Sequence, residues 1–168
     1  MRIARSLAAI AFFAMAAVYC HGQKKAVVHV PIPNSTFPIS EAVYVPAGSD
    51  TLSVSGTTGS VTNPAAPEGS VAAYGDTEAQ TVSTLGKIKA ILAEQKMSLG
   101  DVVMMHAYLA ADPAKGNKMD FAGFMAGYTQ FFGTPDQPNK PARTALQVAN
   151  LAAPWALVEI EVVAAKHK

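Results

Sequence analysis

The sequence predicts an α+β domain in which two helices pack on one face of a sheet. Two observations carry this prediction. Runs rich in β-forming residues alternate with two stretches of helical periodicity, in the order β-β-α-β-α-β-β. Two helices of this length cannot cover both faces of such a sheet, so we expect them on one face. The other face then needs a partner, and a closed symmetric ring of subunits is the natural solution.

The first 22 residues have the layout of a secretory signal peptide. Two arginines precede an apolar block, residues 7–18, and small polar residues follow. This block is shorter than the roughly 18 apolar residues that a membrane-spanning helix needs. We therefore expect export to the periplasm or the medium, with cleavage near Gly22. A lipid anchor on Cys20 is the alternative, which the bulky Tyr19 before it disfavours.

The composition of the mature chain excludes several classes of function. Removing residues 1–22 leaves 11 basic against 12 acidic side chains and a formal charge of −1. A nearly neutral chain lacks the basic stripe that nucleic-acid binding requires, so nucleic acid is not an expected partner. The only cysteine, Cys20, lies in the leader, so neither a disulfide nor a thiol nucleophile is expected.

The N-terminal part of the mature chain is expected to be extended. Residues 23–38 contain three prolines and are interpreted as a lead-in to a single compact domain, residues 39–168. Two β-rich runs, residues 42–45 and 51–55, are joined at Gly48-Ser49-Asp50 and predict a hairpin. Residues 56–75 are rich in glycine, proline and threonine and predict a loop.

The two helices have clear sequence signals. Residues 76–96 carry apolar side chains at spacings of three and four, with Asp76 or Thr77 as N-cap and Gln80 as the capping-box partner. The second helix carries aromatic residues on one face and ends near Gly133, and we interpret the small residues inside it as permitting close packing. The aromatic residues of this face are Phe121, Phe124, Tyr128 and Phe131. Three further strands are expected, at residues 102–109, 143–148 and 157–165.

Charged side chains on the last two predicted strands suggest a site. Arg143 opens one β-run, and Glu159 and Glu161 alternate with apolar residues in the next. A guanidinium near a carboxylate would provide an anchor for a small anion beside a possible general base. The alternatives are a strand-end cap at Arg143 and a solvated strand face at the glutamates. The histidines share no ligand spacing, so no metal is assigned, and His106 is expected to be structural.

Several motifs occur together in a characteristic order. They are Gly75-Asp76 with Gln80-Thr81, Thr84-Leu85 with Ile88 and Ile91-Leu92, Ser98-Leu99-Gly100-Asp101-Val102-Val103, Tyr128 with Phe131-Phe132, Pro141-Ala142-Arg143, and Val158-Glu159-Ile160-Glu161. In this order the set resembles the Rid family, also called YjgF, the reactive intermediate deaminases. The resemblance covers residues 39–165.

The resemblance implies a fold, an assembly and an activity. The fold would be chorismate-mutase-like, assembled as a homotrimer with a central barrel of sheets, outer helices and sites in clefts between subunits. Well-studied members hydrolyse 2-imino acids, the tautomers of enamines, to 2-keto acids and ammonia without metal or organic cofactor. Alternatives are a trimer that binds a small carboxylate metabolite without turnover, and, against the neutral charge, ribonuclease action or inhibition of translation.

The resemblance also implies roles for individual residues. Arg143 matches the arginine that grips the substrate carboxylate, and Glu159 the glutamate that handles the attacking water. Ser55 and Gly56 match a pair that lines the cleft.

The chain departs from the family pattern at three positions. Ala145 stands in the substrate-binding region where the imine deaminases have cysteine, and Met125 stands where they have asparagine. Their cleft tyrosine has no match in register, since Ala42 takes its place and Tyr44 follows two residues later as a substitute.

Overall fold

The computed structural model describes residues 26–167, so the predicted signal peptide, residues 1–22, lies outside the described part. The strands are β1 Val28–Pro31, β2 Ser40–Tyr44, β3 Asp50–Thr58, β4 Val102–Leu109, β5 Ala142–Gln147 and β6 Val158–Lys166. The helices are α1 Val71–Tyr74, α2 Thr77–Glu94 and α3 Phe121–Tyr128, with short 3-10 turns at Leu99–Asp101 and Pro113–Lys115. Among these helices none is long and apolar enough to cross a membrane.

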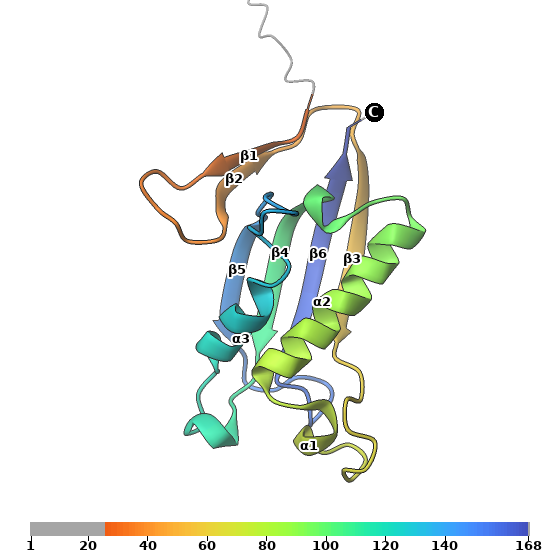
Figure 1. Cartoon of the computed structure of the whole chain (residues 1–168), viewed down its shortest axis with the longest axis vertical. Coiled ribbons are helices and arrows are strands. Elements are labelled where there is room, and N and C mark those ends of the chain that lie inside the picture. Colours follow the sequence, from red (N-terminus) through yellow and green to blue (C-terminus); the bar gives the residue numbers. More distant parts are fainter. Residues whose placement is uncertain (1–25, 168) are drawn as a thin grey trace, which may run out of the picture.

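The predicted α+β class is confirmed. The six strands form one sheet in the order β1-β2-β5-β4-β6-β3, and α2 and α3 lie on one face of it (Figure 1). Strand β6 pairs antiparallel with both β3 and β4, and β4 pairs parallel with β5. The main core lies between this sheet and the two helices, where Leu85, Ile88, Phe124 and Ile160 are fully buried.

The predicted hairpin between residues 42–45 and 51–55 is wrong. Both strands exist, but the turn between them, where Ser49 N donates to Pro46 O, carries the chain across the sheet to its far edge. There β3 pairs with β6, while β2 pairs with β1 along Val28↔Tyr44 and its neighbours. The longer and more apolar β6 offers β3 more backbone hydrogen bonds and burial than the short, exposed β2 would.

The expected lead-in also contributes to the sheet. Residues 28–31 form strand β1, so the sheet begins before residue 39. The β1–β2 hairpin extends beyond the main sheet (Figure 1), because β2 contacts β5 through one parallel bridge, Ser40↔Ala142. Nδ1 of His29 and Oγ of Ser40 both hydrogen-bond the carbonyl of Lys140, at 2.7 and 2.5 Å. These two contacts fix the hairpin against the start of β5.

Gln80 has a different role from the predicted capping box. The N-cap of α2 is Asp76, whose carboxylate accepts from Ala79 N at 2.9 Å. The fully buried Gln80 amide instead donates to the carbonyls of Gly75 and Trp155 and accepts from Leu157 N at 2.8 Å. It therefore ties the start of α2 to the chain entering β6. The predicted loop before it contains the one-turn helix α1.

The face of the sheet opposite the helices, here called the open face, carries partly exposed side chains. On β4 and β6 every second residue is buried against the helices, and the residues between them point to the open face. The open-face residues of strands β3 to β6 are Ser53, Ser55, Met104, His106, Tyr108, Thr144, Leu146, Glu159, Glu161 and Val163. Nothing in the described chain covers this face.

Candidate functional site

Arg143 lies near the start of β5 and points to the helix side of the sheet, into a group of aromatic rings. Its guanidinium carbon is 4.3 Å from the ring centre of Tyr128 and 5.1 Å from that of Phe124. Phe37 and Phe121 follow at 5.6 and 6.0 Å. A cation over aromatic faces is stabilised by the ring quadrupoles. These four rings, which we call the aromatic cage, hold the guanidinium in place.

The polar contacts of Arg143 leave its charge unpaired. Nη1 is 3.3 Å from the sulfur of Met125, a weak acceptor, and the buried Nε has no hydrogen-bond partner. Among the described residues no carboxylate lies within salt-bridge distance of it. Burial lowers the pKa of Arg143, yet a guanidinium stays protonated in proteins. A half-buried, unpaired cation is costly, so this position suits an anion from outside the chain.

Tyr128 supports the cage. Burial raises the pKa of Tyr128, against a smaller lowering effect of Arg143, so its hydroxyl is protonated. That hydroxyl donates to the carbonyl of Pro38 at 2.8 Å. The bond holds the segment that carries Phe37 over the guanidinium.

A cavity of about 420 Å³ lies beside Arg143 where β2 leaves β5. Its lining is mostly apolar, with two hydroxyls and one carboxylate. The lining residues are Ile32, Ile39, Ser40, Glu41, Met104, Ala142, Arg143 and Thr144. The predicted site residue Tyr44 is not among them, because it lies at the exposed end of β2. Ala145 points to the helix side, like Arg143, and packs on the core.

Glu159 and Gly56 do lie together, on the open face. Glu159 is in register with Thr58 of β3 and Tyr108 of β4. A Cβ added at Gly56 would overlap Oε1 of Glu159 and lie 2.9 Å from its Cδ, so the carboxylate rests on the glycine backbone. Ser55 precedes this glycine and is exposed on the same face. The structure thus brings together three of the predicted residues.

The expectation that Arg143 lies near Glu159 is wrong within one chain. Strand β4 separates their strands in the sheet. The two side chains also lie on opposite faces, since Arg143 pairs with the buried Met105 and Glu159 with the open-face Tyr108. Strands that are consecutive in the sequence are expected to be neighbours in the sheet, but β4 lies between β5 and β6, parallel to β5. The candidate site therefore consists of two halves.

Sequence reasoning missed a polar group on the open face. Nδ1 of His106 and the hydroxyl of Tyr108 both lie 2.9 Å from Oε1 of Glu161. The hydrogen bond to Glu161 and, to a smaller degree, burial raise the pKa of Tyr108. The alternation of β4 and β6 does place each of these residues on one face. Only the pairing His106↔Glu161 shows that they meet.

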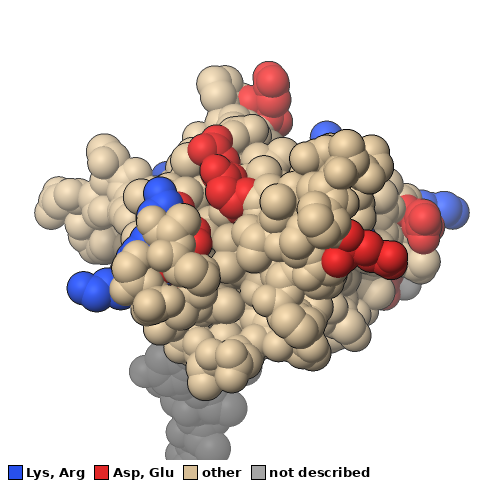
Figure 2. Space-filling model, turned by 90° about the horizontal axis from the view of Figure 1, so that it is seen from below, with Lys and Arg blue, Asp and Glu red and all other residues tan. Residues whose placement is uncertain are grey.

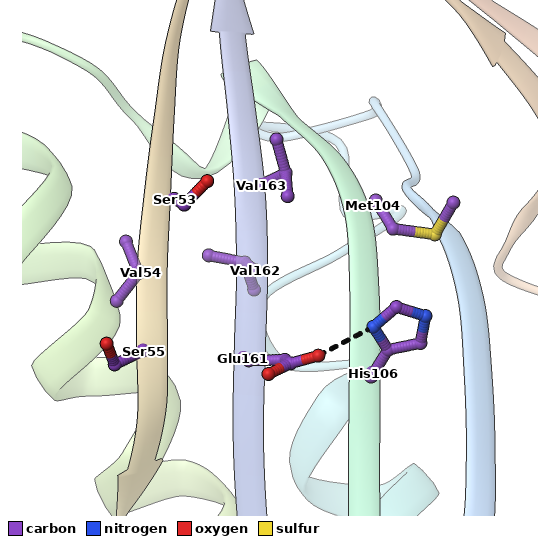
Figure 3. Close-up of a pocket in the computed structure, with 8 residues that line it drawn as sticks. All are labelled: Ser53, Val54, Ser55, Met104, His106, Glu161, Val162 and Val163. Atoms are coloured by element: carbon purple, nitrogen blue, oxygen red, sulfur yellow. Dashed lines mark hydrogen bonds and ion pairs between the residues drawn. The ribbon is translucent and has the colours of Figure 1, made fainter.

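These residues border a second cavity, here called the open-face groove, of about 320 Å³. Figure 3 shows Glu161 reaching from β6 to the His106 ring on β4, with Met104 beside the ring and the serines of β3 on the other side. Its lining residues are Ser53, Val54, Ser55, Met104, His106, Glu161, Val162 and Val163. Met104 also lines the Arg143 cavity, so the two cavities adjoin at this side chain.

A metal ion would require a cluster of ligands, and a polyanion would require a basic surface patch. Within residues 26–167 no group of three or more His, Cys, Asp or Glu side chains could hold a metal ion. On the face drawn in Figure 2, acidic and basic side chains are scattered and form no broad basic patch. That face therefore offers no stripe of cations for a nucleic-acid backbone.

Comparison with known proteins identifies relatives over most of the chain. The model of the family described as endoribonuclease L-PSP matches residues 33–166. A RutC family protein of Pyrococcus abyssi is 36% identical over 104 residues, which are 62% of this chain and 73% of the relative.

Solved structures share the fold. A Yersinia pestis protein of unknown function from the conserved Rid family aligns with a TM-score of 0.58 and 25% identity, covering 80% of this chain and 96% of its own. TdcF from E. coli, solved with bound serine, aligns with a TM-score of 0.52 and 27% identity, covering 85% and 99%. The family match, the six-stranded sheet and the motif order agree, and the chain belongs to the endoribonuclease L-PSP family, also called the YjgF or Rid family.

Proposed function

We propose that this protein hydrolyses reactive 2-imino acids, or the enamines that tautomerise to them, to 2-keto acids and ammonia. The observation that carries the proposal is the unpaired guanidinium of Arg143, held in the aromatic cage beside a cavity large enough for a small carboxylate. The relative TdcF was solved with serine bound, a ligand that bears a carboxylate.

Hydrolysis of an imine requires few catalytic groups. An imine carbon is already electrophilic, so the site must chiefly hold the substrate and place a water. Arg143 binds the carboxylate in two-point contact, which a planar guanidinium allows. Glu159 receives a proton from the attacking water as the C–O bond forms, and the nitrogen leaves as ammonia after protonation. No cofactor enters this scheme.

The proposed site requires more than one copy of the chain. Arg143 and Glu159 lie on opposite faces of the sheet, so Glu159 of a second copy must meet Arg143 of the first. A homotrimer built around the open face would do this and would also cover that face. We further propose that the protein is exported after cleavage near Gly22, with a lipid anchor at Cys20 as the less favoured alternative. N-terminal mass analysis of the secreted or periplasmic protein tests this.

A second candidate function is binding of a small carboxylate metabolite without turnover. The observation that favours it is the apolar surround of Arg143, where Met125 and Ala145 offer no strong hydrogen-bond donor or acceptor. Ribonuclease action, which the family description names, is disfavoured because the charge of the chain is nearly neutral.

The test supplies 2-iminopropanoate, generated in place by an amino-acid oxidase, to the purified mature protein. We expect faster loss of the imine than in buffer, and a drop in kcat/KM of about 10- to 100-fold in Arg143→Ala, since a charged hydrogen-bond partner is lost. Lys89→Ala, which removes an exposed cation on α2, is the matched control. Imine loss equal to buffer would refute hydrolysis. Pyruvate binding that depends on Arg143, without turnover, would instead support the binder.

A further inference from the structure

The open-face groove contains a histidine whose two ring nitrogens have different surroundings. A carboxylate can only accept hydrogen bonds, so Nδ1 of His106 donates to Glu161 and carries the proton. Tyr108 donates a hydrogen bond to the same oxygen and so helps to hold the carboxylate in place. In Figure 3 the second nitrogen, Nε2, points away from Glu161. An imidazole fixed in this tautomer presents a basic Nε2, as in catalytic dyads.

The groove belongs to the half of the site that carries the predicted base. Ser55 lines it, and Gly56 and Glu159 follow along the same face of β3 and β6. It adjoins the Arg143 cavity at Met104, a flexible side chain that is 38% exposed. Since the proposed site joins Arg143 of one copy to Glu159 of a second, His106 of that second copy, on the same face as its Glu159, becomes the titratable neighbour of the bound substrate.

We propose that His106 is a proton-transfer residue of the site and that Glu161 is its positioning residue. This inference rests on the proposed hydrolysis. Glu159 takes a proton from water as the water oxygen bonds to the carbon of the protonated imine, and the C=N electron pair moves to nitrogen. Glu159 then returns this proton to the amine nitrogen. Nε2 of His106 takes the hydroxyl proton as the C=O bond forms and the C–N bond breaks, and it passes that proton to the departing ammonia. Water and the protonated imine thus become a 2-keto acid and ammonium, with every proton accounted for.

The groups around His106 are consistent with this role. Glu161 and Glu159 on β6 are the charged neighbours, Tyr108 lies two residues along on the same strand, and the pairing residue on β5 is the uncharged Thr144. No cation of the described chain lines the groove, so an imidazolium formed in the reaction is stabilised rather than repelled. Titratable side chains thus surround His106 in the open-face groove, whereas mostly apolar side chains surround Arg143.

The test compares His106→Gln with wild type in the coupled imine assay. We expect kcat to fall about hundredfold, the typical contribution of general acid–base catalysis, while KM and the Kd for pyruvate change less than about twofold. His167→Gln is the matched control, because His167 has its ring near Ser49, outside the groove. Added imidazole should partly restore the rate of His106→Ala, which a structural role would not allow.

A second set of variants separates positioning from catalysis. Glu161→Gln should move the pH profile of kcat and lower the rate by about tenfold, and Tyr108→Phe should have a smaller effect in the same direction. Unchanged kcat and pH profile in His106→Gln, with kcat/KM reduced in Arg143→Ala, would overturn the role of His106 and leave the hydrolysis intact. Wild-type protein without turnover would overturn both.

Discussion

Arg143 shows how the surroundings of one residue define its role. An arginine at the start of a strand is ordinarily a partner for a nearby carboxylate. Here the nearest groups are four aromatic rings and a thioether, so the guanidinium is held firmly but its charge is unbalanced within the chain. A partly buried cation without an opposite charge is unfavourable, so an anionic ligand that pairs with Arg143 gains free energy on binding. The residue is therefore prepared for an anion.

Gly56 provides a test of the contact with Glu159. A methyl group at this position would overlap the glutamate carboxylate and displace it. We expect Gly56→Ala to lower kcat roughly hundredfold, since displacing a catalytic group by about 1 Å can cost that much, with Kd for pyruvate nearly unchanged. The measurement is the loss of 2-iminopropanoate generated by an amino-acid oxidase, as in the test of the proposed hydrolysis. Gly86→Ala, where a methyl group meets open space, should leave activity at the wild-type level. Full activity in Gly56→Ala would exclude Glu159 as the base.

Tyr108 allows a direct test of its bond to Glu161. The Glu161 carboxylate accepts a hydrogen bond from the phenol and repels a phenolate, so it raises the pKa of Tyr108 above the usual 10.0. The hydroxyl consequently stays protonated to higher pH in wild type than in Glu161→Gln. Near-ultraviolet titration of the phenolate, taken as a difference from Tyr108→Phe, measures this. Identical titrations with and without Glu161 would show that the bond does not form in solution.

At the scale of elements, the contact between α2 and α3 depends on a glycine. Gly127 is buried, and a Cβ there would lie 2.8 Å from Cβ of Thr81 and 3.0 Å from the carbonyl of Glu78. This confirms the expectation that a small residue in the second helix permits close packing. Because α3 carries Phe124 and Tyr128, the same contact sets where the aromatic cage stands over β5.

Two glycine-to-alanine changes should shift stability in opposite directions. Gly86 is exposed inside α2 and a methyl group there meets nothing, so Gly86→Ala should raise the free energy of unfolding by about 0.5–1 kcal/mol. Gly127→Ala should lower it by about 1–3 kcal/mol, because the helices must separate. Urea unfolding measures both. Equal effects of the two changes would contradict the proposed helix contact.

At the scale of the whole molecule, the open face of the sheet is left uncovered by the described chain. It mixes acidic and hydroxyl side chains with exposed apolar ones, among them Met104 and Leu146, which are 38% and 39% exposed. The two halves of the candidate site lie on opposite sides of the sheet. One assembly of identical chains through this face would cover the apolar groups and complete the site together.

Association through the open face predicts different effects for two exposed apolar residues. If the proposed trimer forms through that face, Leu146→Asp places a charge in its interface and should convert most of it to monomer, measured by sedimentation or light scattering. Val61→Asp alters a side chain that is 49% exposed in the loop before α1 and should leave the trimer intact. Both variants should keep the wild-type circular dichroism. A trimeric Leu146→Asp would place the interface elsewhere.

Local pattern was sufficient for most of the secondary structure, whereas most site candidates came from the resemblance to the family. Alternation in residues 102–109 and 157–165 and the helical spacing in residues 76–96 reflect burial on one face, which a chain encodes locally. The predicted capping box is absent because the Gln80 amide instead bonds the carbonyl of Gly75 and two backbone groups of the chain entering β6, those of Trp155 and Leu157. The strand at residues 28–31 was missed because a short edge strand near prolines resembles a loop.

The sequence by itself determined the α+β class, the family motifs and the choice of Arg143 and Glu159 as candidates. Only the tertiary structure decided which residues meet. Strand order is set by long-range backbone pairing, which leaves no trace in local periodicity, so the sequence could not show β4 between β5 and β6. That one insertion separates Arg143 from Glu159 and brings His106 to Glu161.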